Sequence, residues 1–142
     1  MINAQNTSTV KAEIGSVPRK LICVIDDDVD VLKSLRFLLE TEGFDVRTFR
    51  SGSALLGSRA RGEADCLIID YKMAGIDGLE LTHRLRDLDI STPIVLITGY
   101  ADEGLSATAR SAGVRQVLRK PDLGDSLVAS VRNATDPGAP VD

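Results

Sequence analysis

Hydrophobic residues along the chain gather in five short runs separated by longer segments of mixed polarity. The runs occupy residues 21–25, 44–49, 66–70, 94–98 and 114–118. Three of them, with the sequences LICVI, CLIID and IVLIT, are almost continuously apolar. Such runs are typical of strands that are covered on both faces, as in a parallel sheet. The pattern therefore predicts five strands of a parallel sheet.

Helical periodicity fills the intervals between these runs. Within 29–42, Val31, Leu35 and Leu39 share one face of a helix. Gly43 follows at the position where that helix is expected to end. Similar patterns predict further helices over 53–61, 78–88 and 123–134.

Two aspartates precede predicted helices, and one segment is a weak helix former. Asp28 and Asp77 are placed to act as N-caps. Segment 101–113 contains two glycines and one leucine, so we expect either a short helix that shifts easily or an ordinary surface helix. Alternating strands and helices predict an α/β domain with helices on both faces of the sheet.

The two ends of the chain lack this alternation. Residues 1–19 and 135–142 have no core-forming period, so we expect flexible tails on either side of one domain over 20–134. The N-terminus has no apolar core of a signal peptide, and no run approaches the roughly 20 apolar residues of a membrane span. We therefore expect a soluble, cytoplasmic protein.

Composition narrows the possible classes. The chain is 43% hydrophobic but only 4% aromatic, so its core must be largely aliphatic. A formal net charge of -4 and scattered arginines argue against a nucleic-acid-binding surface. Cys23 and Cys66 lie inside apolar runs and are expected to be free core thiols. His83, the only histidine, is expected to be a solvated surface residue.

Polar residues that could bind a ligand or take part in a reaction stand at the ends of the predicted strands. In α/β sheets ligands bind beyond the carboxyl ends of the strands. The residues at these ends are Asp26, Asp27, Asp28, Asp70, Thr98 and Lys120. Each has an ordinary structural explanation, such as helix capping by Asp28 or solvation of Lys120. The fold would nevertheless bring them to one edge of the sheet.

Clustered carboxylates at such an edge predict a site for a hard divalent cation, most naturally Mg²⁺. Phosphoryl transfer fits the remaining groups. Asp70 would act as a carboxylate nucleophile and form an acyl phosphate. Lys120 would neutralise the charge that develops on the phosphoryl oxygens, and the Thr98 hydroxyl would donate to one of them.

With these motifs the sequence resembles the receiver domain of two-component response regulators, such as the stand-alone chemotaxis regulators, over about residues 20–134. VIDDD matches the acidic pair of that family, and DYKMAGIDGLEL matches its phosphoacceptor segment with a helix-opening glycine at Gly78. IVLITGY matches the switch hydroxyl, and RKP matches the phosphate-binding lysine. The resemblance implies a flavodoxin-like, doubly wound sheet of strand order 2-1-3-4-5.

The resemblance also implies roles for individual residues. Mg²⁺ would be bound directly by Asp27, through water by Asp26, by a side-chain oxygen of Asp70 and by the backbone carbonyl of Lys72. A cis peptide before Pro121 would aim Lys120. The phosphoryl donor would be a histidine kinase.

Several positions depart from the family pattern. Ala74 stands where proline is frequent, and Asp122 stands where an aromatic residue often follows the Lys-Pro pair. Val117 replaces the aromatic residue that usually moves inward when the threonine engages the phosphate. Lys72 and Tyr100 stand at the positions that flank the hydrolytic water, and we expect them to slow dephosphorylation.

We expect a single-domain phosphorylation switch rather than an enzyme, because only about eight residues follow 134. Its signal would leave by protein contact through 101–134, to a downstream protein or a histidine phosphotransfer protein, with a homodimer through this face as a possibility. A phosphate sink or relay intermediate is the nearest alternative. An aspartyl phosphatase is disfavoured because Asp70-Tyr71-Lys72 lacks a second acid, and an FMN binder because three aspartates would repel its phosphate.

Overall fold

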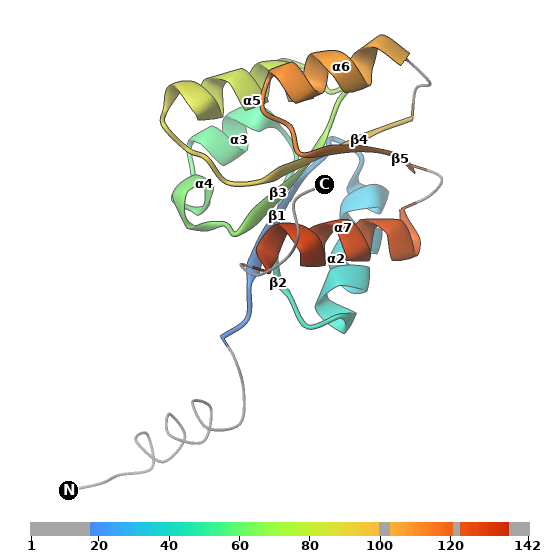
Figure 1. Cartoon of the computed structure of the whole chain (residues 1–142). Helices are drawn as coiled ribbons and strands as arrows, with labels where there is room; N and C mark the ends of the chain where they lie inside the picture. The colour runs from blue at the N-terminus through green and yellow to red at the C-terminus, as the bar shows by residue number, and fades with distance from the viewer. Residues whose placement is uncertain (1–17, 100–102, 121–122, 137–142) are drawn as a thin grey trace, which may run out of the picture.

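The computed structural model describes residues 18–99, 103–120 and 123–136. Five parallel strands form one sheet in the order β2-β1-β3-β4-β5 (Figure 1). The strands are β1 (Leu21–Ile25), β2 (Asp45–Phe49), β3 (Cys66–Asp70), β4 (Ile94–Thr98) and β5 (Gln116–Arg119). The helices are α2 (Val29–Thr41), α3 (Gly52–Leu56), α4 (Ala60–Glu63), α5 (Gly78–Asp87), α6 (Glu103–Ser111) and α7 (Gly124–Thr135). The predicted fold and strand order are confirmed.

Helices cover both faces of this sheet. On one face α3, α4, α5 and α6 pack against the strands, and on the other face α2 and α7 do so (Figure 1). Side chains of a strand alternate between the two faces, so a strand covered on both sides favours apolar residues at successive positions. All residues of β3 and β4 are buried, which explains their continuous apolar runs.

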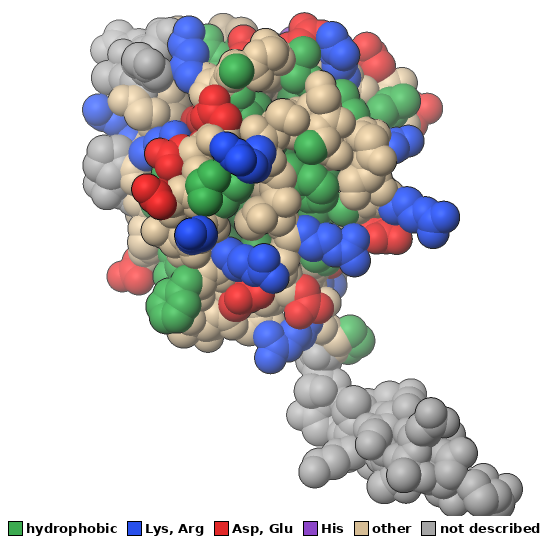
Figure 2. Space-filling model, turned by 180° about the vertical axis from the view of Figure 1, so that it is seen from behind, with side chains coloured by type: hydrophobic (Ala, Val, Ile, Leu, Met, Phe, Trp, Pro, Cys, Tyr) green, Lys and Arg blue, Asp and Glu red, His purple; other side chains and the backbone are tan. Residues whose placement is uncertain are grey.

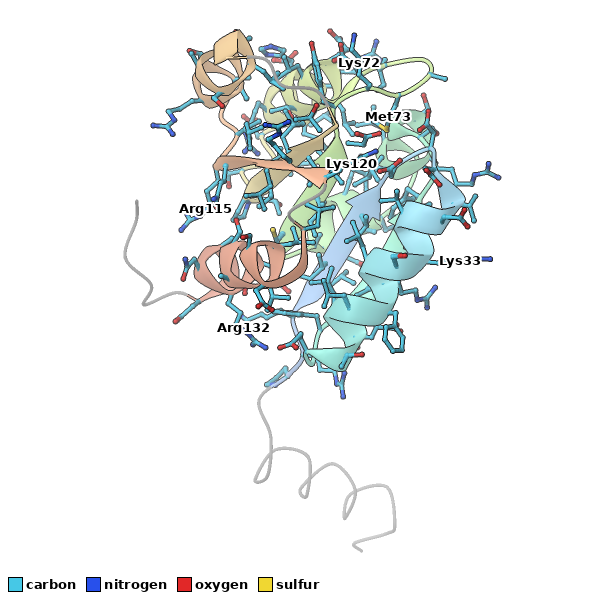
Figure 3. The ribbon with its side chains drawn as sticks, turned by 90° about the vertical axis from the view of Figure 1, so that its right-hand side faces the viewer. Lys33, Lys72, Met73, Arg115, Lys120 and Arg132 are labelled. Atoms are coloured by element: carbon cyan, nitrogen blue, oxygen red, sulfur yellow. The ribbon has the colours of Figure 1, made fainter. Side chains whose placement is uncertain are left out.

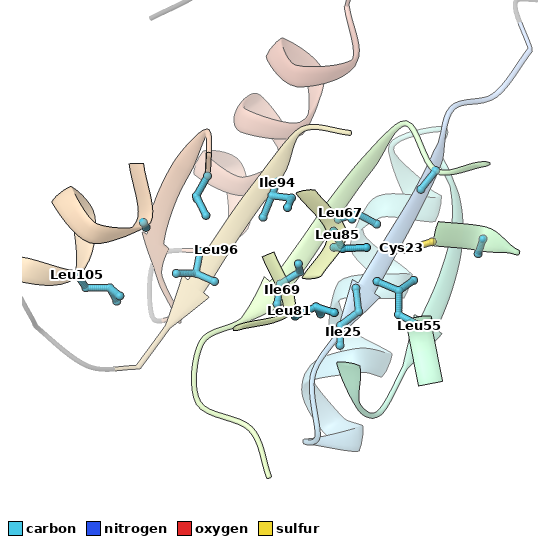
Figure 4. Close-up of a cluster of buried hydrophobic side chains, with 14 residues drawn as sticks. Cys23, Ile25, Leu55, Leu67, Ile69, Leu81, Leu85, Ile94, Leu96 and Leu105 are labelled. Atoms are coloured by element: carbon cyan, nitrogen blue, oxygen red, sulfur yellow. The ribbon is translucent and has the colours of Figure 1, made fainter. Parts of the chain in front are cut away.

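The sheet therefore divides the hydrophobic core into two clusters. The cluster under α3 to α6 includes Cys23, Ile25 and Leu96 (Figure 4). The cluster under α2 and α7 includes Val24 and Cys66. The two cysteines are buried free thiols, as predicted, and they lie in different clusters. Burial raises the pKa of Cys23 to about 11 and that of Cys66 to about 12, so both stay protonated at neutral pH.

The predicted caps form. The Asp28 side chain accepts hydrogen bonds from Asp30 and Val31 N–H at the start of α2. Asp77 accepts from Glu80 N–H at the start of α5. Asp28 thus caps a helix that begins directly after the acidic motif at the end of β1.

One predicted helix, 53–61, is wrong as a single element, since it is split into α3 and α4. Gly57 ends α3, and the Ser58 hydroxyl accepts the Ala60 N–H at 3.1 Å just before α4. Glycine is a poor helix former and serine favours helix starts, so these two residues interrupt the helix.

The last strand begins two residues later than predicted. Gly113 has a φ of 95°, and the Val114 N–H donates to the Ala109 carbonyl at 2.9 Å. Val114 is thus bonded to the end of α6, although it is buried. Strand pairing begins after Arg115, whose N–H donates to the Ile94 carbonyl at 2.8 Å. The other boundaries agree with the prediction to within one or two residues.

The weak segment forms α6 over nine residues. It buries Leu105 and Ala109, one turn apart, which is the thin apolar stripe expected from its sequence. Its ease of displacement stays a prediction.

Other surface features agree with expectation where they are described. His83 is exposed. On the face seen in Figure 2, basic and acidic side chains lie intermixed. No helix in the described ranges is long and apolar enough to cross a membrane. Most of the two expected tails lies outside those ranges.

Arg86 joins three parts of the fold that the sequence pattern did not connect. Its Nη1 donates to the Ile90 and Thr92 carbonyls at 2.7 and 3.0 Å, and its Nη2 donates to the Gly113 carbonyl at 2.8 Å. The guanidinium thereby ties the end of α5 to the turn between α6 and β5.

We predict that Arg86→Ala lowers the free energy of unfolding by about 2–4 kcal/mol, because three carbonyls lose a charged donor. Arg84→Ala is the matched control on the same helix. Arg84 makes an exposed ion pair with Glu80, so its loss should cost no more than about 0.5 kcal/mol. Urea denaturation of both variants measures the difference, and equal losses would contradict the assignment.

Candidate functional site

Three aspartates meet at the carboxyl end of the sheet. Asp26 and Asp27 directly follow β1, and Asp70 is the last residue of β3, the strand beside it. One carboxylate oxygen from each of the three lies within 4.8 Å of the others. The adjacent strands and their matching lengths therefore bring together carboxylates that are more than 40 residues apart in sequence.

These carboxylates differ in burial and in hydrogen bonding. Asp26 is fully buried, and its Oδ1 accepts the Asp28 N–H at 2.9 Å. Asp27 is exposed, and its Oδ2 accepts the Ala74 N–H at 3.2 Å. Asp70 is only 3% exposed. The donor from Ala74 was not predictable from sequence, because it is a backbone group brought close by the loop after β3.

Lys120 supplies the positive charge of the site. Its Nζ lies 3.2 Å from Asp26 Oδ2 and 3.3 Å from Asp70 Oδ2. Figure 3 views the molecule toward this edge of the sheet and shows Lys120 near its centre, with Lys72 and Met73 above it. The predicted convergence of Asp26, Asp27, Asp70 and Lys120 is therefore present in the structure.

Burial and neighbouring charges shift the pKa values of Asp70 and Lys120. Burial, together with the negative charge of Asp26, raises the pKa of Asp70 to about 6, although Lys120 opposes that shift. Burial acts to lower the pKa of the Lys120 ammonium, but the charges of Asp26 and Asp70 outweigh it and raise that pKa. Lys120 thus stays charged at neutral pH and holds two carboxylates that would otherwise repel each other.

The donor set fits a divalent cation. Apart from its ion pair with Lys120, the buried Asp26 Oδ2 accepts no hydrogen bond from the described residues. A buried carboxylate oxygen with spare lone pairs is costly unless a cation compensates it. Three converging carboxylates, one of them exposed, are hard oxygen ligands of the kind that Mg²⁺ takes together with water.

Gly78 determines how closely α5 approaches the end of β3. Its N–H donates to the Tyr71 carbonyl at 2.8 Å. A Cβ at this position would lie 2.6 Å from the Asp70 carbonyl oxygen and 2.7 Å from Leu96 Cδ1. Only glycine therefore fits where the helix begins, which gives the glycine of the matched motif a physical reason.

The other predicted site residues take different places. Thr98 ends β4 and is 2% exposed, one residue beyond the Ile97 that pairs with Asp70. Lys72 is exposed, with its Nζ 5.4 Å from the centre of the Tyr71 ring. Val117 lies on β5 and packs against the core cluster beneath α6. Tyr100, Pro121 and the predicted cis peptide lie outside the described residues, as does Asp122.

Comparison with known proteins agrees with this arrangement. A model of the response regulator receiver domain matches residues 22–132. The chain belongs to the response regulator receiver domain family. Phosphorylation and magnesium binding in an acidic pocket are general features of receiver domains.

The receiver domain has curated relatives among transcriptional regulators. It is 36% identical over 113 residues to the transcriptional regulatory protein FixJ of Bradyrhizobium diazoefficiens, covering 80% of this chain and 55% of FixJ. It is 35% identical over 115 residues to the C4-dicarboxylate transport transcriptional regulatory protein DctD of Rhizobium meliloti, covering 81% of this chain and 25% of DctD. The chain spans about half or less of the length of these relatives.

Solved receiver domains share the same fold. A receiver domain protein from Clostridium thermocellum matches with a TM-score of 0.76 at 28% identity, over 82% of this chain and 94% of that chain. The crystal structure of FixJ-N matches with a TM-score of 0.73 at 28% identity, over 87% of this chain and 98% of that chain.

The raised pKa of Asp70 predicts a pH-dependent stability difference in the absence of metal. A carboxyl whose folded pKa of about 6 exceeds its ordinary 3.8 destabilises the fold when ionised, so stability falls as pH rises between these values. We expect Asp70→Asn to be more stable than wild type by about 1–2 kcal/mol at pH 8, and this advantage to vanish near pH 4.

Chemical denaturation in EDTA at several pH values measures this difference. Asp45→Asn, which changes an exposed acid on β2, is the control and should show no such trend. A constant difference between wild type and Asp70→Asn across the range would contradict the raised pKa.

Proposed function

We propose that this receiver domain is a cytoplasmic phosphorylation switch in which Asp70 accepts a phosphoryl group from a histidine kinase in a magnesium-dependent reaction. The observation that carries the proposal is the Lys120 ammonium, which lies between the buried carboxylates of Asp26 and Asp70 beside Asp27. This is the charge arrangement that transfer of an anionic group to a carboxylate requires.

The chemistry follows from the groups at the strand ends. An oxygen of the Asp70 carboxylate attacks phosphorus, the bond between phosphorus and the donor histidine nitrogen breaks, and an acyl phosphate forms. Asp26, Asp27, Asp70 and the Lys72 carbonyl would hold Mg²⁺, which neutralises charge on the phosphoryl oxygens. Lys120, already 3.3 Å from Asp70 Oδ2, would pair with a phosphoryl oxygen, and the Thr98 hydroxyl would donate to another.

The readout would pass through α6, β5 and α7. Thr98 ends β4 beside β5, and Lys120 directly follows β5, so both phosphate-contacting groups adjoin this part of the domain. The half-buried Val117 is small, so the readout would depend on displacement of α6 and β5 rather than on rotation of an aromatic ring. A downstream protein or a histidine phosphotransfer protein would receive the signal.

We predict that acetyl phosphate with Mg²⁺ adds one phosphoryl group to the wild type, as measured by intact mass. Asp70→Asn should add none, because the nucleophile is removed. EDTA should abolish the reaction in the wild type, because the acidic cluster then lacks its cation.

Asp28→Asn is the matched control, because Asp28 belongs to the same acidic motif but caps α2, a role that asparagine fulfils equally well. It should be phosphorylated like the wild type. Phosphorylation of Asp70→Asn to the wild-type extent would refute the proposed acceptor.

We further predict that Lys72 and Tyr100 slow the loss of phosphate by restricting the hydrolytic water. The double variant Lys72→Ala/Tyr100→Ala should lose its phosphoryl group at least about threefold faster, which corresponds to a barrier lower by at least about 0.6 kcal/mol. The decay of the phosphorylated mass after removal of donor measures the rate. Decay of the wild type within seconds, or equal rates in both proteins, would contradict this prediction.

A further inference from the structure

The segment from α6 to the end of β5 has an unusual charge for this protein. Residues 104–120 contain Arg110, Arg115, Arg119 and Lys120 and neither aspartate nor glutamate, whereas the whole chain has 21 acidic and 17 basic side chains. Lys120 turns inward to the aspartates. The other three cations, hereafter the arginine cluster, remain on the α6–β5 surface.

Among the described residues the arginine cluster has no acidic partner, in contrast to arginines on several other elements. Arg36, Arg47, Arg84 and Arg132 each form an ion pair with a glutamate. Within 18–99, 103–120 and 123–136, no carboxylate lies within ion-pair distance of Arg110, Arg115 or Arg119. Arg115 makes one long hydrogen bond, 3.4 Å from its Nη2 to the Asn133 carbonyl, and Arg110 and Arg119 are exposed.

A pocket lies within this surface. Its volume is about 260 Å³, and it is lined by Ser106, Arg110, Val114, Arg115, Gln116 and Val117. The lining thus combines two arginines and two other polar residues with two valines. In Figure 3 Arg115 projects from the edge of the sheet between the ribbons of α6 and α7, and β5 is one of the two edge strands. The pocket is therefore accessible to a partner.

From these features we infer that the α6–β5 surface binds an acidic peptide segment of a partner protein, with a carboxylate seated in the pocket between Arg110 and Arg115. A second carboxylate meets Arg119. The inference rests on the proposed function, because the partner would be the receiver of its signal. Charge complementarity selects the partner, since guanidinium groups bind carboxylates in a bidentate manner.

A protein partner is favoured over a nucleic acid. Three arginines are few for a phosphate backbone, and the formal net charge of -4 repels a polyanion at long range. A short acidic segment interacts mainly with the arginines next to it. At physiological salt, charges more than about 8 Å away are largely screened.

The site is also placed to respond to phosphorylation. Arg119 pairs with Thr98 in the register of β4 and β5 and directly precedes Lys120. Movement of Lys120 or Thr98 toward a phosphoryl group would therefore move Arg119, so the affinity for the acidic segment should differ between the two states.

The test uses the full chain and a fluorescein-labelled peptide of alternating glutamate and leucine, with fluorescence anisotropy as the readout. Arg110→Glu/Arg115→Glu is compared with Arg50→Glu/Arg59→Glu, which makes the same change in net charge at two exposed arginines elsewhere. We expect about tenfold weaker binding in the first variant, equivalent to about 1.4 kcal/mol, and a change within about twofold in the second. Circular dichroism checks that both variants are folded.

A single-stranded DNA oligonucleotide of equal charge forms the second arm. The inference is overturned if the wild type does not bind the peptide, if both variants weaken binding equally, or if the oligonucleotide is bound more tightly through Arg110 and Arg115. Intact mass after acetyl phosphate treatment is recorded on the same samples. Absence of a phosphoryl group there counts against the proposed function, whereas phosphorylation without charge-dependent peptide binding counts against this inference alone.

Discussion

The ion pairs of Lys120 with Asp26 and Asp70 are the interaction on which the site depends. Two buried carboxylates at the ends of adjacent strands repel each other, and burial makes that repulsion stronger than in water. The ammonium lies 3.2 and 3.3 Å from one oxygen of each. Without it, the fold would hold two like charges in a site of low dielectric, and the simplest relief would be protonation of Asp70, which would then no longer be a nucleophile.

The parallel sheet brings Lys120, Asp26 and Asp70 together for a simple geometric reason. All strands of a parallel sheet end at the same edge, so residues that close β1, β3 and β5 become neighbours although they are far apart in sequence. The positions at which α2 and α5 begin then determine how the chain is arranged around these residues. Asp28 turns the chain into α2, and Gly78 lets α5 approach the Asp70 carbonyl. Lys120 directly follows β5, and the arginine cluster lies on α6 and along β5, so the acidic pocket adjoins this outer surface.

Much of this could be predicted from sequence, because continuous apolar runs and strand-end acids are local signals. Helix breaks, strand starts and main-chain hydrogen bonds depend on the geometry of the folded backbone, and these could not be predicted. The split at Gly57 and Ser58 was hidden by an amphipathic pattern, and buried Val114 looked like strand although it is bonded to α6. The Ala74 N–H that orients Asp27 and the carbonyls bound by Arg86 have no side-chain signature at all. Main-chain partners of this kind emerge only from the folded chain.

The most direct test is an NMR titration of the Asp70 side-chain carboxyl carbon in metal-free wild type and in Lys120→Met, a neutral variant of similar length. The account predicts a pKa of about 6 in the wild type and a higher value in Lys120→Met, because the ammonium that opposes the shift is gone. An Asp70 pKa near 3.8 that is the same in both proteins would show that the two carboxylates and the lysine do not form the coupled site described above.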